Sequence, residues 1–324
     1  MRFRGVITPL LTPFNDDGSI NYEHLERNLK AWNEWNIDGV VVNGSGGEFP
    51  HTSQEEQMDL VKFVKARTSK FVIACVPEQG TKLAADGCRK AAEAGADAAL
   101  VFVPYYWRDA LSDDVIFDHF TAVADSSPIP VLLYANPPST LFEISVNVAV
   151  KLADHPNIVG MKDSTADRLL AKDLSQRVSV LFRYRSVSPV FDDLSLQVSK
   201  LGLIAQATKG KHFDVLVGRD TLLVPGWLLG CSGGIVGMSS SLGKLHGEMQ
   251  ALVKDHRFEE AAEIHHKITS VAAAVTSMSV IPALKALMDI VGLYGGPPRA
   301  PLKSIPEAGT AKLRDAVEKI GFKL

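Results

Sequence analysis

The sequence has only three cysteines, Cys75, Cys88 and Cys231, an odd number without paired spacing. Such a set excludes a disulfide framework, so we expect reduced thiols in an intracellular protein. The nine histidines form neither an HExxH motif nor a histidine–carboxylate cluster at a strand end. A class II aldolase, which needs a metal held by such ligands, is therefore not predicted, and we expect no metal or other cofactor.

The sequence also lacks an excess of charge of one sign and any long apolar run. Its 324 residues include 34 Lys and Arg against 37 Asp and Glu, and no basic stripe is interleaved with aromatics. Nucleic acid is therefore not an expected partner. No apolar stretch approaches the ~20 residues that span a bilayer, so no membrane partner is expected. The first strand-like run begins at Gly5, which leaves no room for a signal peptide, and we predict a soluble cytoplasmic protein.

Eight short runs are rich in Val, Ile, Leu and Ala, without alternation of apolar and polar residues. Continuous apolar runs of this kind are typical of parallel strands that are covered on both faces. The runs are Gly5–Thr8, Gly39–Asn43, Phe71–Val76, Ala98–Val103, Pro130–Tyr134, Asn157–Lys162, Phe213–Val217 and Gly233–Gly237.

Amphipathic stretches between these runs predict helices, and Ser53 with Glu56 forms a capping-box signature before one of them. The first four are Tyr22–Trp35, Gln54–Arg67, Lys82–Ala94 and Asp113–Ala124. Alternating strands and helices predict an α/β fold, a (β/α)8 TIM barrel over residues 1–255. Residues 256–324 contain no strand pattern and predict a C-terminal helical extension with helices at Glu259–Met278, Ala283–Val291 and Ala311–Ile320.

One section of the barrel is about twice as long as a typical βα unit. It runs from Lys162 to Phe213 and includes a predicted helix at Leu194–Ala207, which leaves about residues 165–193 as an insertion. Two interpretations are open. The insertion is either a lid or hairpin beside the site, or a disordered loop or stretch foreign to the protein, such as a retained intron. We favour the second.

Lys162 closes one of the apolar runs, so a buried strand is expected to deliver its amine to the rim of the sheet. Burial disfavours the ammonium form of a lysine. A lysine that loses its proton becomes a nucleophile toward carbonyls, as in the Schiff-base chemistry of class I aldolases. The competing interpretation is an inert strand-end lysine that reaches toward solvent.

Other chemistry-bearing residues follow the ends of neighbouring strands, where the active sites of such barrels lie. The second run leads into the turn Gly44–Glu48, whose backbone N–H groups and Ser45 hydroxyl are suited to a carboxylate. We interpret Glu48 as a buried hydrogen-bonding residue that braces this turn. The fifth run ends in Tyr134, and Tyr106 follows the fourth. A lysine, a carboxylate-binding turn and phenols on one rim predict a site for a 2-oxo acid.

Three motifs together carry a resemblance: GSGGE at Gly44–Glu48, Tyr134 before a proline turn, and GMKDS at Gly160–Ser164. With them the chain resembles the pyruvate-dependent class I lyases and synthases typified by dihydrodipicolinate synthase and N-acetylneuraminate lyase. The resemblance covers nearly the whole chain apart from residues 165–193. Within the family, the chain is most similar to the 4-hydroxy-2-oxoglutarate aldolases, in the segments Gly44–Pro50, Ser127–Tyr134, His155–Ser164 and Tyr294–Leu302.

The resemblance implies a role for each matching residue and a homotetramer built as a dimer of dimers. Lys162 is implied to be the Schiff-base lysine and Tyr134 the catalytic tyrosine. Tyr106 is implied to extend the proton relay from a neighbouring subunit. The implied substrate-binding residues are Ser45 and Gly46 at the pyruvate carboxylate, Ser164 near the lysine, and Gly218 and Val236 in the pocket lining.

The resemblance also implies an activity, the cleavage of 4-hydroxy-2-oxoglutarate to pyruvate and glyoxylate. Dihydrodipicolinate synthases carry an arginine five residues after the catalytic tyrosine, and Ser139 stands there in this chain, which argues against that activity. Gly46 is smaller than the polar residues common in relatives, and Leu141 replaces a common glycine.

Three alternatives stay open. The first is a sibling 2-oxo acid aldolase, either a lyase for a keto-deoxy sugar acid or sialic acid, or a dihydrodipicolinate synthase-like enzyme. The second is a phosphosugar-binding barrel that uses Gly218 and Gly233–Gly234 as a phosphate cradle. The third is a non-catalytic barrel that serves as a binding or scaffold protein.

Overall fold

Eight parallel strands close into a barrel in this computed structural model, which describes residues 2–165 and 200–323. Each strand pairs with the next, and β8 pairs with β1. The predicted TIM barrel is confirmed, and the predicted strand ends differ from the observed ones by no more than about two residues. The strands are β1 Gly5–Pro9, β2 Gly39–Val42, β3 Phe71–Val76, β4 Ala98–Phe102, β5 Val131–Ala135, β6 Ile158–Asp163, β7 Asp214–Val217 and β8 Gly233–Ile235.

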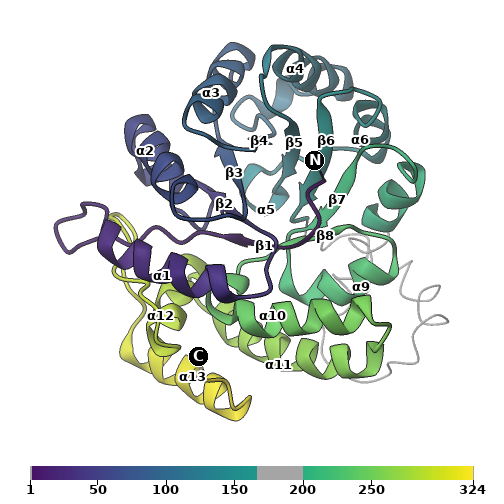
Figure 1. Cartoon of the computed structure of the whole chain (residues 1–324). Helices are drawn as coiled ribbons and strands as arrows, with labels where there is room; N and C mark the ends of the chain where they lie inside the picture. The colour runs from purple at the N-terminus through teal and green to yellow at the C-terminus, as the bar shows by residue number, and fades with distance from the viewer. Residues whose placement is uncertain (1, 166–199, 324) are drawn as a thin grey trace.

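Helices surround the barrel (Figure 1). The predicted capping box is confirmed, because Ser53 Oγ accepts from Glu56 N and the Glu56 carboxylate accepts from Ser53 N. Residues 200–207 are helical, as predicted. The rest of the predicted helix Leu194–Ala207, and the insertion after Thr165, lie outside the described residues. The helices are α1 Tyr22–Glu34, α2 Gln54–Lys65, α3 Thr81–Glu93, α4 Asp113–Ser126, α5 Pro137–Thr140, α6 Val146–Leu152, α9 Leu223–Leu228 and α10 Ser239–Lys254.

The C-terminal part of the chain is helical, as predicted. It consists of α11 Phe258–Thr276, α12 Val280–Ile290 and α13 Glu307–Lys319. These helices pack on one another and on α10, at one side of the barrel (Figure 1). The division between a barrel of residues 1–255 and an extension of residues 256–324 stays a prediction.

Two apolar cores follow from the alternation of side chains along each strand. The smaller core fills the inside of the barrel, and Tyr134 belongs to it together with Phe102, Leu132 and Leu216. The larger core lies between the strands and the surrounding helices. A strand with both faces covered has no polar face, which explains the continuous apolar runs of the sequence.

All three cysteines are buried free thiols, and burial raises the pKa of each. Among the described residues, no helix combines the length and apolar character that crossing a bilayer requires.

Candidate active site

Lys162 and Tyr134 lie side by side at the ends of neighbouring strands. The register of β5 and β6 pairs the two residues directly. Both are buried, with 8% and 2% of their surface exposed. Lys162 Nζ donates a hydrogen bond to Tyr134 Oη at 3.1 Å and lies 4.3 Å from the centre of the ring. The amine therefore has a phenol within proton-transfer distance in a largely apolar surrounding.

The turn that follows β2 reaches the same phenol. Ser45 Oγ lies 3.4 Å from Tyr134 Oη. The turn is closed by a hydrogen bond from Gly47 N to Gly44 O at 2.9 Å, and Glu48 adopts a left-handed conformation with φ of 57°. The structure thus brings Lys162, Tyr134 and Ser45 into one connected group.

Gly46 lies against the segment that follows β1. A Cβ on Gly46 would meet the end of the Leu11 side chain at 2.9 Å. A larger residue here would therefore have to displace the end of a flexible leucine side chain.

Ser164 and Gly218 meet beyond the ends of β6 and β7. Gly218 N donates to Asp163 O at 2.7 Å. A Cβ on Gly218 would lie 1.9 Å from Ser164 Oγ and 2.8 Å from Asp163 O, so this position beside Ser164 requires glycine.

The two remaining predicted site residues are placed differently. The Val236 side chain is fully buried in the core between strands and helices, and its role in the pocket lining stays a prediction. Tyr106 is 71% exposed and packs edge-on against Trp107, itself 72% exposed. Within one chain Tyr106 does not join the group around Lys162, and its role in a neighbouring subunit stays a prediction. Tyr105, not Tyr106, packs against the inner core through Phe102.

Comparison with known proteins decides the family. The sequence model described as "Dihydrodipicolinate synthetase family" matches residues 2–207 and 197–320. The chain is 30% identical to 4-hydroxy-tetrahydrodipicolinate synthase of Methanothrix thermoacetophila over 318 residues, 98% of this chain and 97% of that protein. It belongs to the dihydrodipicolinate synthetase family. Its members are lyases and aldolase-type synthases that work through a Schiff base, and this chain is an enzyme of that class.

Other relatives agree with this assignment. N-acetylneuraminate lyase of Rhizobium meliloti is 28% identical over 322 residues, which cover 99% of this chain and 96% of that protein. A crystal structure of dihydrodipicolinate synthase from Bacillus anthracis superposes with a TM-score of 0.84 at 26% identity, over 98% of both chains.

Buried charged residues form a network at the Gly44–Glu48 turn, and only part of it was predicted from the sequence. The prediction that Glu48 braces the turn is confirmed, since its side chain is 1% exposed and pairs with Lys285 at 2.9 Å. Lys285 and Arg299 themselves were missed. Two features of the sequence pointed to them: Lys285 is a lysine in the apolar helix α12, and Arg299 lies in the family-like segment Tyr294–Leu302. Their contacts with Glu48 join distant parts of the chain, and periodicity does not predict such contacts.

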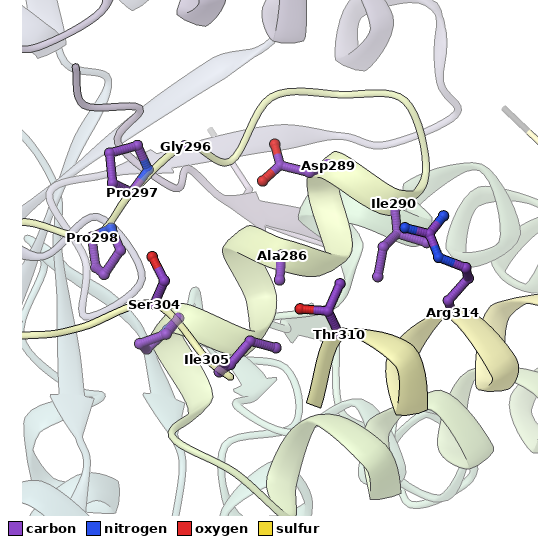
Figure 2. A pocket seen from close by; sticks show the side chains of 11 residues that line it. Ala286, Asp289, Ile290, Gly296, Pro297, Pro298, Ser304, Ile305, Thr310 and Arg314 are labelled. Atoms are coloured by element: carbon purple, nitrogen blue, oxygen red, sulfur yellow. The ribbon is translucent and has the colours of Figure 1, made fainter. Parts of the chain in front are cut away.

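A cavity of about 440 Å³ lies away from the Lys162 site. It lies in the C-terminal part between α12, α13 and the connecting segment, and Asp289 and Arg314 face it from the two helices (Figure 2). Pro297 and Pro298 form another part of its wall. Burial raises the pKa of Asp289, which accepts a hydrogen bond from Gly295 N at 2.8 Å.

Removing residues 166–193 is expected to preserve the fold and the group around Lys162. The described flanks already meet, because Lys200 Nζ lies 3.0 Å from Asp163 Oδ2 and 2.7 Å from Glu143 Oε1. Residues 194–199 would then link Thr165 to Lys200, and an extended link of that length reaches about 24 Å, farther than an ion pair separates two Cα atoms. The melting temperature and the yield of a borohydride-trapped pyruvate adduct check this. Loss of folded protein on deletion would contradict it.

Proposed function

We propose that this chain cleaves 4-hydroxy-2-oxoglutarate to pyruvate and glyoxylate through a Schiff base on Lys162. The observation that carries the proposal is the buried Lys162 amine, 3.1 Å from the Tyr134 phenol and within reach of the turn at Ser45. The bare N–H groups of that turn suit the carboxylate that every 2-oxo acid carries next to its reactive carbonyl.

The proposed reaction begins when neutral Lys162 attacks C2 of the substrate. Tyr134 passes a proton to the carbinolamine oxygen, which leaves as water and gives the iminium. The iminium is an electron sink, so the C3–C4 bond breaks when Tyr134 takes the proton of the C4 hydroxyl, and glyoxylate departs. Protonation of the enamine at C3 and hydrolysis of the iminium release pyruvate and restore Lys162. Ser45, 3.4 Å from the phenol, hydrogen-bonds Tyr134 during these transfers.

The position five residues after Tyr134 supports this choice of substrate. Ser139 stands there, and its Oγ accepts a hydrogen bond from Asn136 Nδ2 at 3.2 Å inside the turn that begins α5. No cationic side chain is available at this position for the carboxylate of a second amino-acid substrate. The turn ends at Leu141, which has a φ of 52°, in the left-handed region that favours glycine.

A second candidate is the reaction of a sibling. Several relatives, including the proteins of Methanothrix thermoacetophila and Archaeoglobus fulgidus, are named 4-hydroxy-tetrahydrodipicolinate synthases, at 30% and 29% identity. That reaction would use the same Schiff base and a different electrophile in place of glyoxylate.

The test is a comparison of kcat/KM on one preparation. We expect 4-hydroxy-2-oxoglutarate to exceed a keto-deoxy sugar acid, N-acetylneuraminate and the condensation of pyruvate with aspartate semialdehyde by about 100-fold or more, because missing contacts to a polar substrate lower transition-state binding strongly. A higher value for any competitor would replace the proposed substrate. No turnover of any of them, combined with protection against heat by phosphate, would favour the phosphosugar-binding alternative.

A further inference from the structure

Lys285 is a second buried lysine, and its surroundings differ from those of Lys162. Its side chain is 1% exposed and its ammonium lies 2.9 Å from the Glu48 carboxylate. Lys285 Nζ also donates to the carbonyl oxygens of Thr12 at 2.8 Å and Pro297 at 2.9 Å. The ammonium thus has two hydrogen-bond acceptors and one ion-pair partner. Burial lowers the pKa of Lys285, while the neighbouring Glu48 carboxylate acts in the opposite direction.

Two contacts of Lys285 lead directly to the turn at the active site. Glu48 is the last residue of that turn, and Thr12 donates its hydroxyl proton to Gly47 O at 2.8 Å. Lys285 therefore supports the turn in two ways. It pairs with Glu48, the last residue of the turn, and it binds the carbonyl of Thr12, whose hydroxyl hydrogen-bonds Gly47. The first part of the turn carries Ser45, which reaches Tyr134.

Arg299, from the C-terminal part of the chain, and His51 contact the other oxygen of the same carboxylate. Glu48 Oε2 accepts from Arg299 N at 3.0 Å and lies 3.2 Å from His51 Nδ1. The Arg299 guanidinium is fixed in turn by both carboxylate oxygens of Glu56, at 2.9 and 2.7 Å. These contacts and the ion pair with Lys285 fix the position of the Glu48 side chain.

The segment that carries these groups fits α12 closely. A Cβ on Gly295 would lie 2.0 Å from Lys285 O, so only glycine permits this approach. Gly296 has a φ of 67°, and the chain then passes through Pro297, whose carbonyl binds Lys285. The position of Lys285 is therefore set by packing and not by its ion pair alone.

The placement of Glu48 creates an electrostatic conflict that Lys285 resolves. In the proposed function, the Gly44–Glu48 turn holds the carboxylate of a 2-oxo acid, and a buried Glu48 charge in the same turn would repel that anion. Repulsion between like charges is strong where water is excluded.

From these contacts we infer that Lys285 is a positioning residue for the 2-oxo acid. Its ammonium neutralises Glu48 and fixes the Gly44–Glu48 turn in the form that accepts a carboxylate. Lys285 acts through the turn and does not touch the substrate. This inference rests on the proposed function.

The test measures the pyruvate concentration that gives half-maximal borohydride-trapped adduct. Lys285→Met is expected to raise this concentration about tenfold or more, while saturating pyruvate still gives an adduct, because an uncompensated carboxylate opposes anion binding. Adding Glu48→Gln to Lys285→Met removes both charges and is expected to reverse most of the rise. The matched control is Lys65→Met, which breaks the Lys65–Asp97 ion pair of 2.6 Å beside the start of β4 and should shift the concentration less than about twofold.

Lys285→Gln serves as a second variant if Lys285→Met does not fold, since it keeps N–H donors for the two carbonyls without the charge. It is expected to give the same rise. The inference would be overturned if a folded Lys285 variant had a half-saturating concentration within twofold of wild type, or if Lys65→Met gave an equal rise. It would also be overturned if the double variant showed no recovery, or if neither Lys285 variant folded. Absence of an adduct in the wild type would instead remove the proposed function, and the inference with it.

Discussion

Lys162→Ala is expected to lower kcat/KM for pyruvate release by about 10⁴-fold or more, because the proposed reaction forms its covalent intermediate on the Lys162 amine. It should also abolish the pyruvate adduct that borohydride traps in the wild type. Both effects have one cause, since the iminium that borohydride reduces is the electron sink of the cleavage. Mass spectrometry of the intact protein after borohydride treatment with pyruvate, together with steady-state kinetics, measures them.

Burial alone does not identify Lys162 as the nucleophile, because Lys285 is buried more deeply. The partners distinguish the two amines. Burial lowers the pKa of Lys285, but a carboxylate and two carbonyl oxygens around it oppose this effect, whereas Lys162 donates to the Tyr134 hydroxyl. Lys285→Met is therefore the matched control, and it should still give an adduct at saturating pyruvate. An adduct that persists in Lys162→Ala, or one that disappears only in the Lys285 variant, would contradict the assignment.

The barrel could be predicted from the sequence because its physical cause is local. A parallel strand covered on both faces is apolar along most of its length, so each strand left a nearly continuous apolar run. The ends were less certain, since a run such as Gly233–Gly237 continues past the last ladder pair, and β8 ends at Ile235. Residues after Ile235 stay apolar because they pack against helices, which an apolar run does not distinguish from a strand.

The sequence predicted which residues come together where they lie at the ends of neighbouring strands. Lys162 and Tyr134 come from adjacent strands in register, so the rule that barrel chemistry lies at strand ends places them together. The rule does not say which face a strand-end side chain takes, because side chains alternate along a strand, and the Val236 side chain lies in the core between strands and helices. Lys285 could not be placed at all, since its contact with Glu48 depends on how the C-terminal part packs.

Tyr134→Phe is the second variant with a large expected effect, a fall in kcat of about 10² to 10³-fold with little change in KM. Phenylalanine retains the ring that packs on Phe102, at 4.3 Å between centroids, so the inner core should stay intact. What is lost is Oη, the atom that lies 3.1 Å from Lys162 Nζ and 3.4 Å from Ser45 Oγ. Single-turnover rates of adduct formation and of substrate cleavage measure the effect separately.

The expected pattern follows from the two proton transfers assigned to the phenol. Lys162 is unchanged in Tyr134→Phe, so the adduct should still form, but more slowly, and cleavage should slow as well because the C4 hydroxyl has lost its base. Tyr294→Phe is the matched control, since that phenol lies 3.4 Å from Phe14 O and not at the Lys162 site. A rise in KM without a fall in kcat would mean that the Tyr134 hydroxyl binds substrate equally in the ground and transition states. Unchanged kinetics would require another proton carrier, and Tyr106 of a neighbouring subunit would then be the first residue to replace.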